Sequence, residues 1–169
     1  MDLKLTYAPS SDGQLFMSYT DADHGGNPDN GRSTSGYLMK MGTGAISWCS
    51  KLQSIVTLST TEAEFVAAVS AGQEVIWLRS FLSELGYDMT APSVLNVDNQ
   101  SAISVAKNPE HHGRMKHLDL RFFWLRDQVE AKVIGLKYLA TAEMPADVLT
   151  KPLDRLRVQG CRGMMGLFG

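Results

Sequence analysis

Four acidic residues are spaced along the chain at positions where a carboxylate could act as a metal ligand. Asp21, Glu64, Asp98 and Asp147 each follow an apolar, strand-like run or stand near the first turn of a predicted helix. If they converge, they cannot all stay ionised without divalent cations, because like charges a few Å apart raise one another's pKa. The pattern predicts a metal site, and the most economical chemistry for it is phosphodiester hydrolysis with two metal ions.

The first acid is placed by a predicted strand over residues 15–20. Leu15, Met17 and Tyr19 share one face by the two-residue period, and Asp21 continues on that face at the carboxyl end of the strand. Residues 25–36 are rich in Gly, Asn, Asp and Ser, which is typical of turns. Residues 37–40 and 45–50 then predict two more strands joined by a short link, as in an antiparallel meander.

The second acid belongs to a predicted helix that begins at Ser59 and ends before Gly86. Stepping back four residues from the apolar stripe places Glu64 on the sheet-facing side, whereas Glu62 points away from it. With Ser59 as N-cap, Glu62 fits a capping box. The sequence therefore predicts a structural Glu62 and a functional Glu64. The stripe consists of Ala68, Ala71, Val75, Leu78, Leu82 and Leu85.

The other two acids follow in the second half of the chain. Asp98 ends a predicted strand over residues 93–97 and precedes a helix over 100–107, and Asp147 lies in the first turn of a short helix within 141–150. A helix over 118–131 and a strand over 133–139 lie between them. This order predicts one α/β domain over residues 1–169 with a mixed sheet, antiparallel then parallel, a core at about 14–152 and a tail at 153–169.

Composition limits the partners. The chain has 169 residues, 44% of them hydrophobic, and a net charge of −2, so any nucleic-acid contact must be local. Two basic stretches are candidates, residues 111–126 and the cluster Lys151, Arg155, Arg157 and Arg162. The sequence shows neither an apolar run of membrane-spanning length nor a signal-peptide pattern at residues 1–10, so we expect an intracellular protein without a membrane partner.

Eight short segments, in order along the chain, form a recognisable set. They are Thr20-Asp21-Ala22-Asp23, Ser35-Gly36-Tyr37, Ser47-Trp48, Ser59-Thr60-Thr61-Glu62-Ala63-Glu64-Phe65, Trp77-Leu78-Arg79, Asp98-Asn99-Gln100-Ser101-Ala102, Lys116-His117-Leu118-Asp119 and Ala146-Asp147-Val148-Leu149-Thr150-Lys151-Pro152. Together they resemble the ribonuclease H domain of copia-type retrotransposon Pol polyproteins. That family has an α/β ribonuclease H-like fold, a five-stranded mixed sheet flanked by helices, and its four acids match Asp21, Glu64, Asp98 and Asp147.

The resemblance implies cleavage of the RNA strand of RNA–DNA hybrids during reverse transcription, with two Mg²⁺ or Mn²⁺ ions on the four acids. It places Asn27, Thr60 and Gln100 where related enzymes contact the minor groove. It also implies the reverse transcriptase domain of the same polyprotein as a partner and a cytoplasmic, virus-like particle as the location. Asp23 is a second candidate ligand beside Asp21, although a loop aspartate more often caps a turn.

Two other functions on the same fold stay open. A domesticated descendant would keep the fold as a catalytically silent nucleic-acid or protein interaction module. A DNA strand-transfer or resolvase enzyme would also use clustered acids, but the fourth acid, Asp147, disfavours it. The chain also lacks a histidine between His117 and Asp147, where cellular ribonucleases H carry one, so proton transfer to the leaving group would fall to water or another residue.

Overall fold

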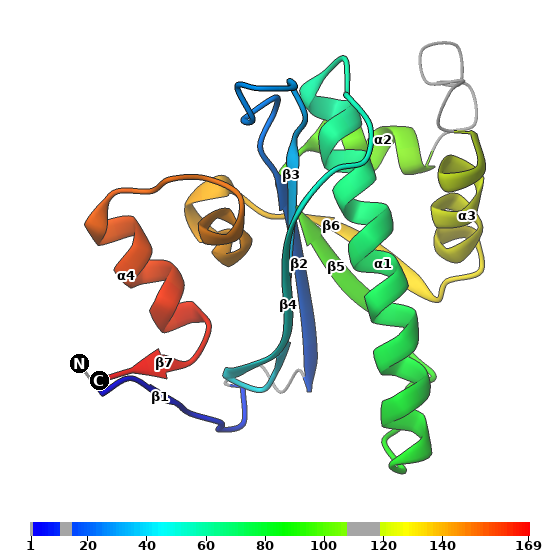
Figure 1. The fold of residues 1–169 in the computed structure, drawn as a ribbon. Coiled ribbons are helices and arrows are strands. Elements are labelled where there is room, and N and C mark those ends of the chain that lie inside the picture. Colours follow the sequence, from blue (N-terminus) through cyan, green and yellow to red (C-terminus); the bar gives the residue numbers. More distant parts are fainter. Residues whose placement is uncertain (1, 11–14, 108–118) are drawn as a thin grey trace.

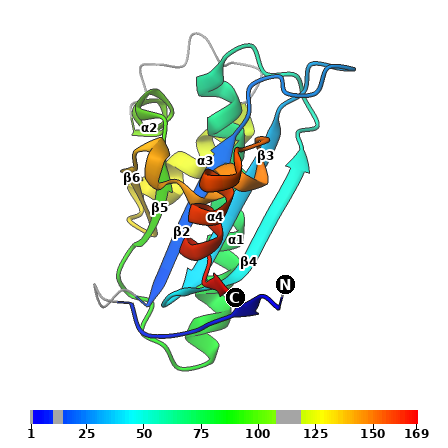
Figure 2. The same ribbon diagram turned by 90° about the vertical axis from the view of Figure 1, so that its left-hand side faces the viewer.

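A mixed β-sheet forms the centre of the molecule, with helices on both of its faces (Figure 1). The computed structural model describes residues 2–10, 15–107 and 119–169. In the described part of the chain, the sheet has five strands in the order β4-β3-β2-β5-β6. Helices α1, α2 and α3 cover one face, and the C-terminal segments, including α4, lie on the other (Figures 1 and 2).

The sheet combines an antiparallel and a parallel half, as the sequence predicts. The strands β2 (Phe16–Ala22), β3 (Thr34–Met41) and β4 (Gly44–Leu52) form the antiparallel meander. The strand β5 (Ser93–Val97) pairs in parallel with β2, and β6 (Ile134–Tyr138) pairs in parallel with β5. The meander strands are longer than predicted, and β2 continues through Asp21 to Ala22, so this acid is fixed by strand pairing rather than by a loop.

Helix α1 (Thr60–Glu84) begins and ends where the sequence predicts. The Ser59 side chain accepts a hydrogen bond from the Glu62 backbone N–H at 3.2 Å, and Gly86 adopts a φ of +88°, which favours glycine. Glu62 departs from the standard capping box, because its Oε2 accepts from the N–H of Leu58, at 2.6 Å, one residue before the cap. Glu62 is therefore structural, as predicted.

The main core lies between α1 and the sheet. Phe65, Val75, Leu95 and Leu125 are fully buried there, and the apolar stripe of α1 is buried from Ala68 to Leu82. Leu85, the last member of the predicted stripe, is 59% exposed because it follows the end of the helix. Burial of this face supplies the main stabilisation of the helix, which in turn holds Glu64 against the sheet.

Two further helices lie beside α1. Helix α2 (Gln100–Lys107) starts directly after Asp98, and α3 (Asp119–Glu130) precedes β6. The predicted basic stretch over residues 111–126 falls mostly outside the described part of the chain, so its role in nucleic-acid contact stays a prediction.

The C-terminal segments are more ordered than a tail. The short helix predicted within residues 141–150 consists of two 3-10 turns, η3 (Thr141–Glu143) and η4 (Pro145–Leu149). Helix α4 (Arg155–Met164) and strand β7 (Leu167–Phe168) follow, and β7 pairs with β1 (Lys4–Leu5). Met165 packs with Leu38 and Ala45 of the sheet, so residues 153–169 close its second face.

Among the residues that the structure describes, no helix combines the length and the apolar character that crossing a bilayer requires.

Candidate metal centre

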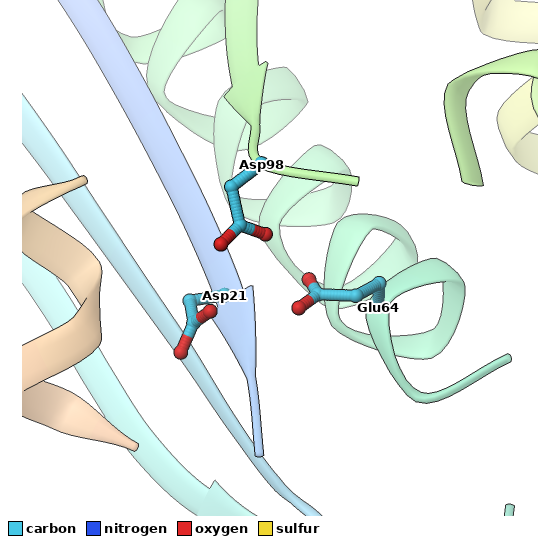
Figure 3. A group of neighbouring side chains, drawn as sticks. All are labelled: Asp21, Glu64 and Asp98. Carbon is cyan, nitrogen blue, oxygen red and sulfur yellow. The ribbon is translucent and has the colours of Figure 1, made fainter. Parts of the chain in front are cut away.

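Three of the four predicted acids converge at the carboxyl ends of β2 and β5. Asp21 of β2, Glu64 of α1 and Asp98 after β5 point toward one another from three elements (Figure 3). One carboxylate oxygen from each lies within 4.8 Å of the others. Oxygens around a Mg²⁺ at roughly 2.1 Å lie up to roughly 4 Å apart, so small side-chain adjustments would bring these three into one coordination shell.

Strand pairing fixes the separation of two of these acids. Thr20 of β2 is in register with Val97 of β5 in a parallel pair, so the next residues, Asp21 and Asp98, lie side by side near the carboxyl ends of these strands. The Thr141 hydroxyl donates a hydrogen bond to Asp98 Oδ2 at 3.1 Å. Asp98 is thus oriented by the first residue of η3, and Asp21 by its place inside β2.

Glu64 reaches the same point because α1 approaches β2 closely. Ala63 and Ala67 of the helix pack against Ala22, and such small side chains allow the helix to lie close to the strand. Glu64 is buried, with 6% of the residue exposed. Its Oε2 is buried and has no hydrogen-bond partner in the described part of the protein. An orphaned buried carboxylate oxygen is costly, and it is the feature that a bound cation would satisfy.

Electrostatics also distinguish Glu64. Burial, followed by the charges of Asp21 and Asp98, raises its pKa to about 9, against opposing effects of the Ala22 backbone and Lys151. Burial also raises the pKa of Asp21, although hydrogen bonds from Lys151 and Thr150 oppose this. Without a metal ion, Glu64 is therefore mainly protonated at neutral pH, because a third negative charge in this buried site is unfavourable.

Asp147, the fourth predicted acid, lies outside the three-acid cluster and has different neighbours. It is buried in η4, and its Oδ1 accepts from Lys151 Nζ at 3.2 Å while its Oδ2 accepts from Arg157 at 3.0 Å. Lys151 Nζ also donates to Asp21 Oδ1 at 2.8 Å. Asp147 is thus connected to the three-acid cluster through a lysine, and both of its carboxylate oxygens are engaged by cations.

A glycine allows η4 to approach this part of the sheet. Gly36 of β3 is the direct partner of Asp21, and a Cβ at Gly36 would lie 2.6 Å from Thr150 Cγ2 and 3.0 Å from Leu149 Cβ. The Thr150 hydroxyl in turn donates a short hydrogen bond to Asp21 Oδ2. A side chain at position 36 would displace the segment that carries Asp147 and Lys151, so the glycine positions the site.

The predicted substrate contacts lie outside the three-acid cluster. Asn27 lies in the loop after β2, Thr60 opens α1 and Gln100 opens α2; the last two are exposed. The side chain of Asn27 accepts from the Asp29 N–H at 2.9 Å. Asp23, the alternative ligand, instead accepts a short hydrogen bond from the Thr34 N–H. It closes the loop, the structural role that its position suggests.

Sequence reasoning missed the two cations that contact Asp147. Lys151 and Arg157 belong to a basic cluster that the sequence suggests for nucleic-acid contact, but both turn inward onto buried carboxylates. The spacing of four between Asp147 and Lys151 is one signal that could have revealed the first pair. Arg157 lies ten residues from Asp147 and on another helix, so no local pattern indicates that pair.

Comparisons with known proteins identify sequence relatives of this chain. No family model matches the chain. It is 45% identical over 153 residues to the retrovirus-related Pol polyprotein from transposon TNT 1-94 of Nicotiana tabacum, covering 90% of this chain and 11% of that protein. It is 38% identical over 151 residues to the Pol polyprotein from transposon RE2 of Arabidopsis thaliana, covering 89% and 10%. The chain therefore spans about a tenth of the length of these relatives.

Among solved structures, the fold is similar to that of LC11-RNase H1, determined in complex with an RNA/DNA hybrid. The two share 20% sequence identity with a TM-score of 0.53, over 80% of this chain and 93% of the other. The order of the five strands and the position of the acids agree with the α/β fold expected from the sequence. The chain is thus a relative of one segment of the retrovirus-related Pol polyproteins of plant transposons, and it has the ribonuclease H fold.

Proposed function

We propose that this chain hydrolyses the RNA strand of RNA–DNA hybrids with the help of divalent metal ions. The observation that carries the proposal is the buried cluster of Asp21, Glu64 and Asp98 at the carboxyl edge of the parallel strands, with one Glu64 oxygen unpartnered. Ligands of open α/β sheets collect at this edge. The kinship with Pol polyproteins and the ribonuclease H fold support the same reaction class.

The donor set fits Mg²⁺ or Mn²⁺. It consists only of carboxylate oxygens, which hard cations prefer, and the orphaned Glu64 Oε2 has no other partner among the described residues. Two such ions on the four acids would activate a water molecule and stabilise the departing 3′ oxygen. Asp21, Glu64 and Asp98 would hold the first ion, and Asp21 with Asp147 would hold the second.

The protein residues would mainly orient charge and exclude water. Thr141 holds Asp98 and Thr150 holds Asp21, so neither carboxylate needs to reorganise much when it binds a cation. Preorganised ligands of this kind lower the cost of reaching the transition state. Asn27, Thr60 and Gln100 would contact the minor groove and distinguish ribose from deoxyribose. Thr60 opens α1, which carries Glu64, Gln100 opens α2 two residues after Asp98, and Asn27 lies in the loop that follows β2.

The relatives suggest the setting of this reaction. Pol polyproteins of transposons are the proteins that the chain resembles over most of its length. We propose that it works with the reverse transcriptase domain of such a polyprotein, inside the cell and within a virus-like particle, without a membrane partner. Removal of the RNA template after first-strand synthesis is the task that this setting requires.

One observation favours a second function, that of a catalytically silent interaction module. Lys151 and Arg157 neutralise Asp147, and Lys151 also pairs with Asp21, so this part of the site is balanced without any metal ion. A domesticated protein could keep such a site for stability alone. The buried three-acid cluster, in which one Glu64 oxygen has no hydrogen-bond partner among the described residues, favours catalysis over this alternative.

A cleavage assay separates these functions. Wild-type protein, with Mg²⁺ or Mn²⁺, should cleave a labelled RNA strand in a hybrid much faster than duplex RNA or duplex DNA. Asp21→Asn should reduce the rate by more than about 100-fold, because even changes to residues behind the ligands cost 10–100-fold. Asp88→Asn, an exposed turn residue, is the matched control. No cleavage of any substrate would favour the silent module, and preference for duplex DNA would favour a strand-transfer or resolvase enzyme.

A further inference from the structure

Lys151 occupies the space between two of the acids. Its Nζ lies 2.8 Å from Asp21 Oδ1 and 3.2 Å from Asp147 Oδ1. The Asp21 side chain is fully buried and that of Asp147 is 3% exposed, whereas that of Lys151 is 32% exposed. The lysine therefore reaches in from the surface, and its flexible four-carbon stem could withdraw toward solvent without disturbing the core.

Among the described residues, the cations that pair with the acids, Lys151 and Arg157, contact one side of the acidic site. Arg157 takes the other oxygen of Asp147 and also donates to the backbone carbonyls of Thr141, Ala142 and Met144, so it is anchored by the surrounding turns. Lys151 Nζ donates to the two carboxylates, and among the described residues it has no hydrogen bond to a backbone carbonyl. On the other side, Glu64 Oε2 has no partner in the described part of the chain. A divalent ion would therefore have to displace Lys151 on the Asp147 side, but no described cation on the Glu64 side.

We propose that Lys151 is an internal counter-ion that must leave Asp21 and Asp147 before these two acids can hold a second divalent ion. The proposal deepens the proposed function, because it concerns the same acids. The three-acid side can accept an ion while Lys151 stays in place. The Asp21–Asp147 side can accept an ion only after Lys151 has withdrawn. The apparent affinity of this side is therefore its intrinsic affinity multiplied by the fraction of molecules in which Lys151 has withdrawn.

The first test counts bound ions directly. Isothermal titration calorimetry of the whole chain with Mn²⁺ should show one tighter and one weaker site. Lys151→Gln should strengthen the weaker site by roughly tenfold, within the usual range of coupling between sites, and leave the tighter site nearly unchanged. Lys4→Gln removes the same charge in β1, away from the acids, and should change neither site. Equal affinities and stoichiometry in wild type and Lys151→Gln would overturn the proposal.

The second test needs no substitution and covers the case in which Lys151→Gln fails to fold. The wild-type protein is treated with an amine-acetylating reagent at increasing Mn²⁺, and acetylation of each lysine is measured by mass spectrometry. Lys151 should be protected without metal and become reactive only in the concentration range of the weaker site, while Lys4 stays reactive throughout. Protection of Lys151 that persists after both sites are filled would overturn the proposal.

These outcomes are separable from failure of the proposed function. If no hybrid is cleaved but Lys151 responds to Mn²⁺ as described, the lysine is a counter-ion in an acidic site with another purpose. If hybrid is cleaved but Mn²⁺ binding and Lys151 reactivity are independent of each other, the nuclease stands and the role of Lys151 falls.

Discussion

The two sides of the acidic site share Asp21 but balance their charge in opposite ways. On one side, Glu64 and Asp98 lie next to Asp21, and no cation among the described residues pairs with either of them. The pKa of Glu64 rises to about 9 through burial and the charges of Asp21 and Asp98. On the other side, Lys151 and Arg157 pair with Asp147, and hydrogen bonds and attraction to Asp21 and Asp147 raise the pKa of Lys151 although burial alone would lower it. In the described part of the chain, the Glu64 side thus has no paired cation, whereas the Asp147 side has two, Lys151 and Arg157.

This difference separates binding capacity from stability. A buried acid without a partner lowers the stability of the metal-free protein and can be stabilised by an ion, whereas a buried ion pair is costly to break. Substitutions on the two sides should therefore change the free energy of unfolding of the metal-free protein in opposite directions.

Removing Arg157 should destabilise the protein most. Arg157→Ala would remove the donor to Asp147 Oδ2 and one donor each to the carbonyls of Thr141, Ala142 and Met144. Hydrogen bonds to charged groups contribute about 1.5–3 kcal/mol each, and partial exposure of the arginine lowers the total, so we expect a loss of about 2–4 kcal/mol. Urea unfolding in EDTA measures it.

Arg155→Ala is the control for this substitution. Arg155 lies in the same helix, α4, but is exposed. Its removal should change the free energy of unfolding by less than about 0.5 kcal/mol. Equal effects of the two substitutions would show that the ion pair with Asp147 contributes nothing to stability.

Neutralising Glu64 should instead raise the free energy of unfolding of the metal-free protein. The pKa of Glu64 is about 9 in the folded protein and 4.5 for the free side chain. Between these values the folded state binds a proton that the unfolded state lacks, so the free energy of unfolding of the metal-free protein should fall as pH rises through this window. Glu64→Gln should flatten this decline and be more stable than wild type near pH 9 by about 1–3 kcal/mol.

The measurement is urea unfolding in EDTA at several pH values from 5 to 9. Glu84→Gln, at the exposed end of the same helix, should keep the wild-type slope. A wild-type stability that rises with pH over this range, or a Glu64→Gln variant with the same slope as wild type, would contradict the electrostatic account of Glu64.

Magnesium should stabilise the wild-type protein by a smaller amount. With a dissociation constant of about 1 mM, 10 mM Mg²⁺ adds about 1.4 kcal/mol, or a rise in Tm of about 3–5 °C for a chain of this size. Asp98→Asn should raise the Tm of the metal-free protein, because it removes a charge beside Glu64, and it should reduce the response to Mg²⁺. Melting curves of wild type that do not respond to Mg²⁺ would argue against the metal site.

Much of this arrangement could be predicted from the sequence because its signals are local. The period of two in residues 15–20 and the apolar stripe after Glu64 indicate which side chains face the core, and Ser59 with Gly86 marks the ends of α1. Parallel pairing after a helical crossover then places Asp98 next to Asp21. These inferences need only short-range patterns and the rules of sheet topology.

The ion pairs of Asp147 could not be predicted in the same way. They depend on how closely η4 approaches β3 at Gly36 and on where α4 packs, and both are tertiary features. A basic residue is equally compatible with a solvated surface, a phosphate contact or a buried pair. Only the packing of the C-terminal segment against the sheet decides between them for Lys151 and Arg157.

The most direct test of the contrast is a crystal structure with Mn²⁺ at a concentration that fills only the tighter site, with the ion located by its anomalous scattering. We expect one peak bound by Asp21, Glu64 and Asp98, with Lys151 still hydrogen-bonded to Asp147. A first peak between Asp21 and Asp147 with Lys151 displaced, or no peak at the three acids, would contradict this account.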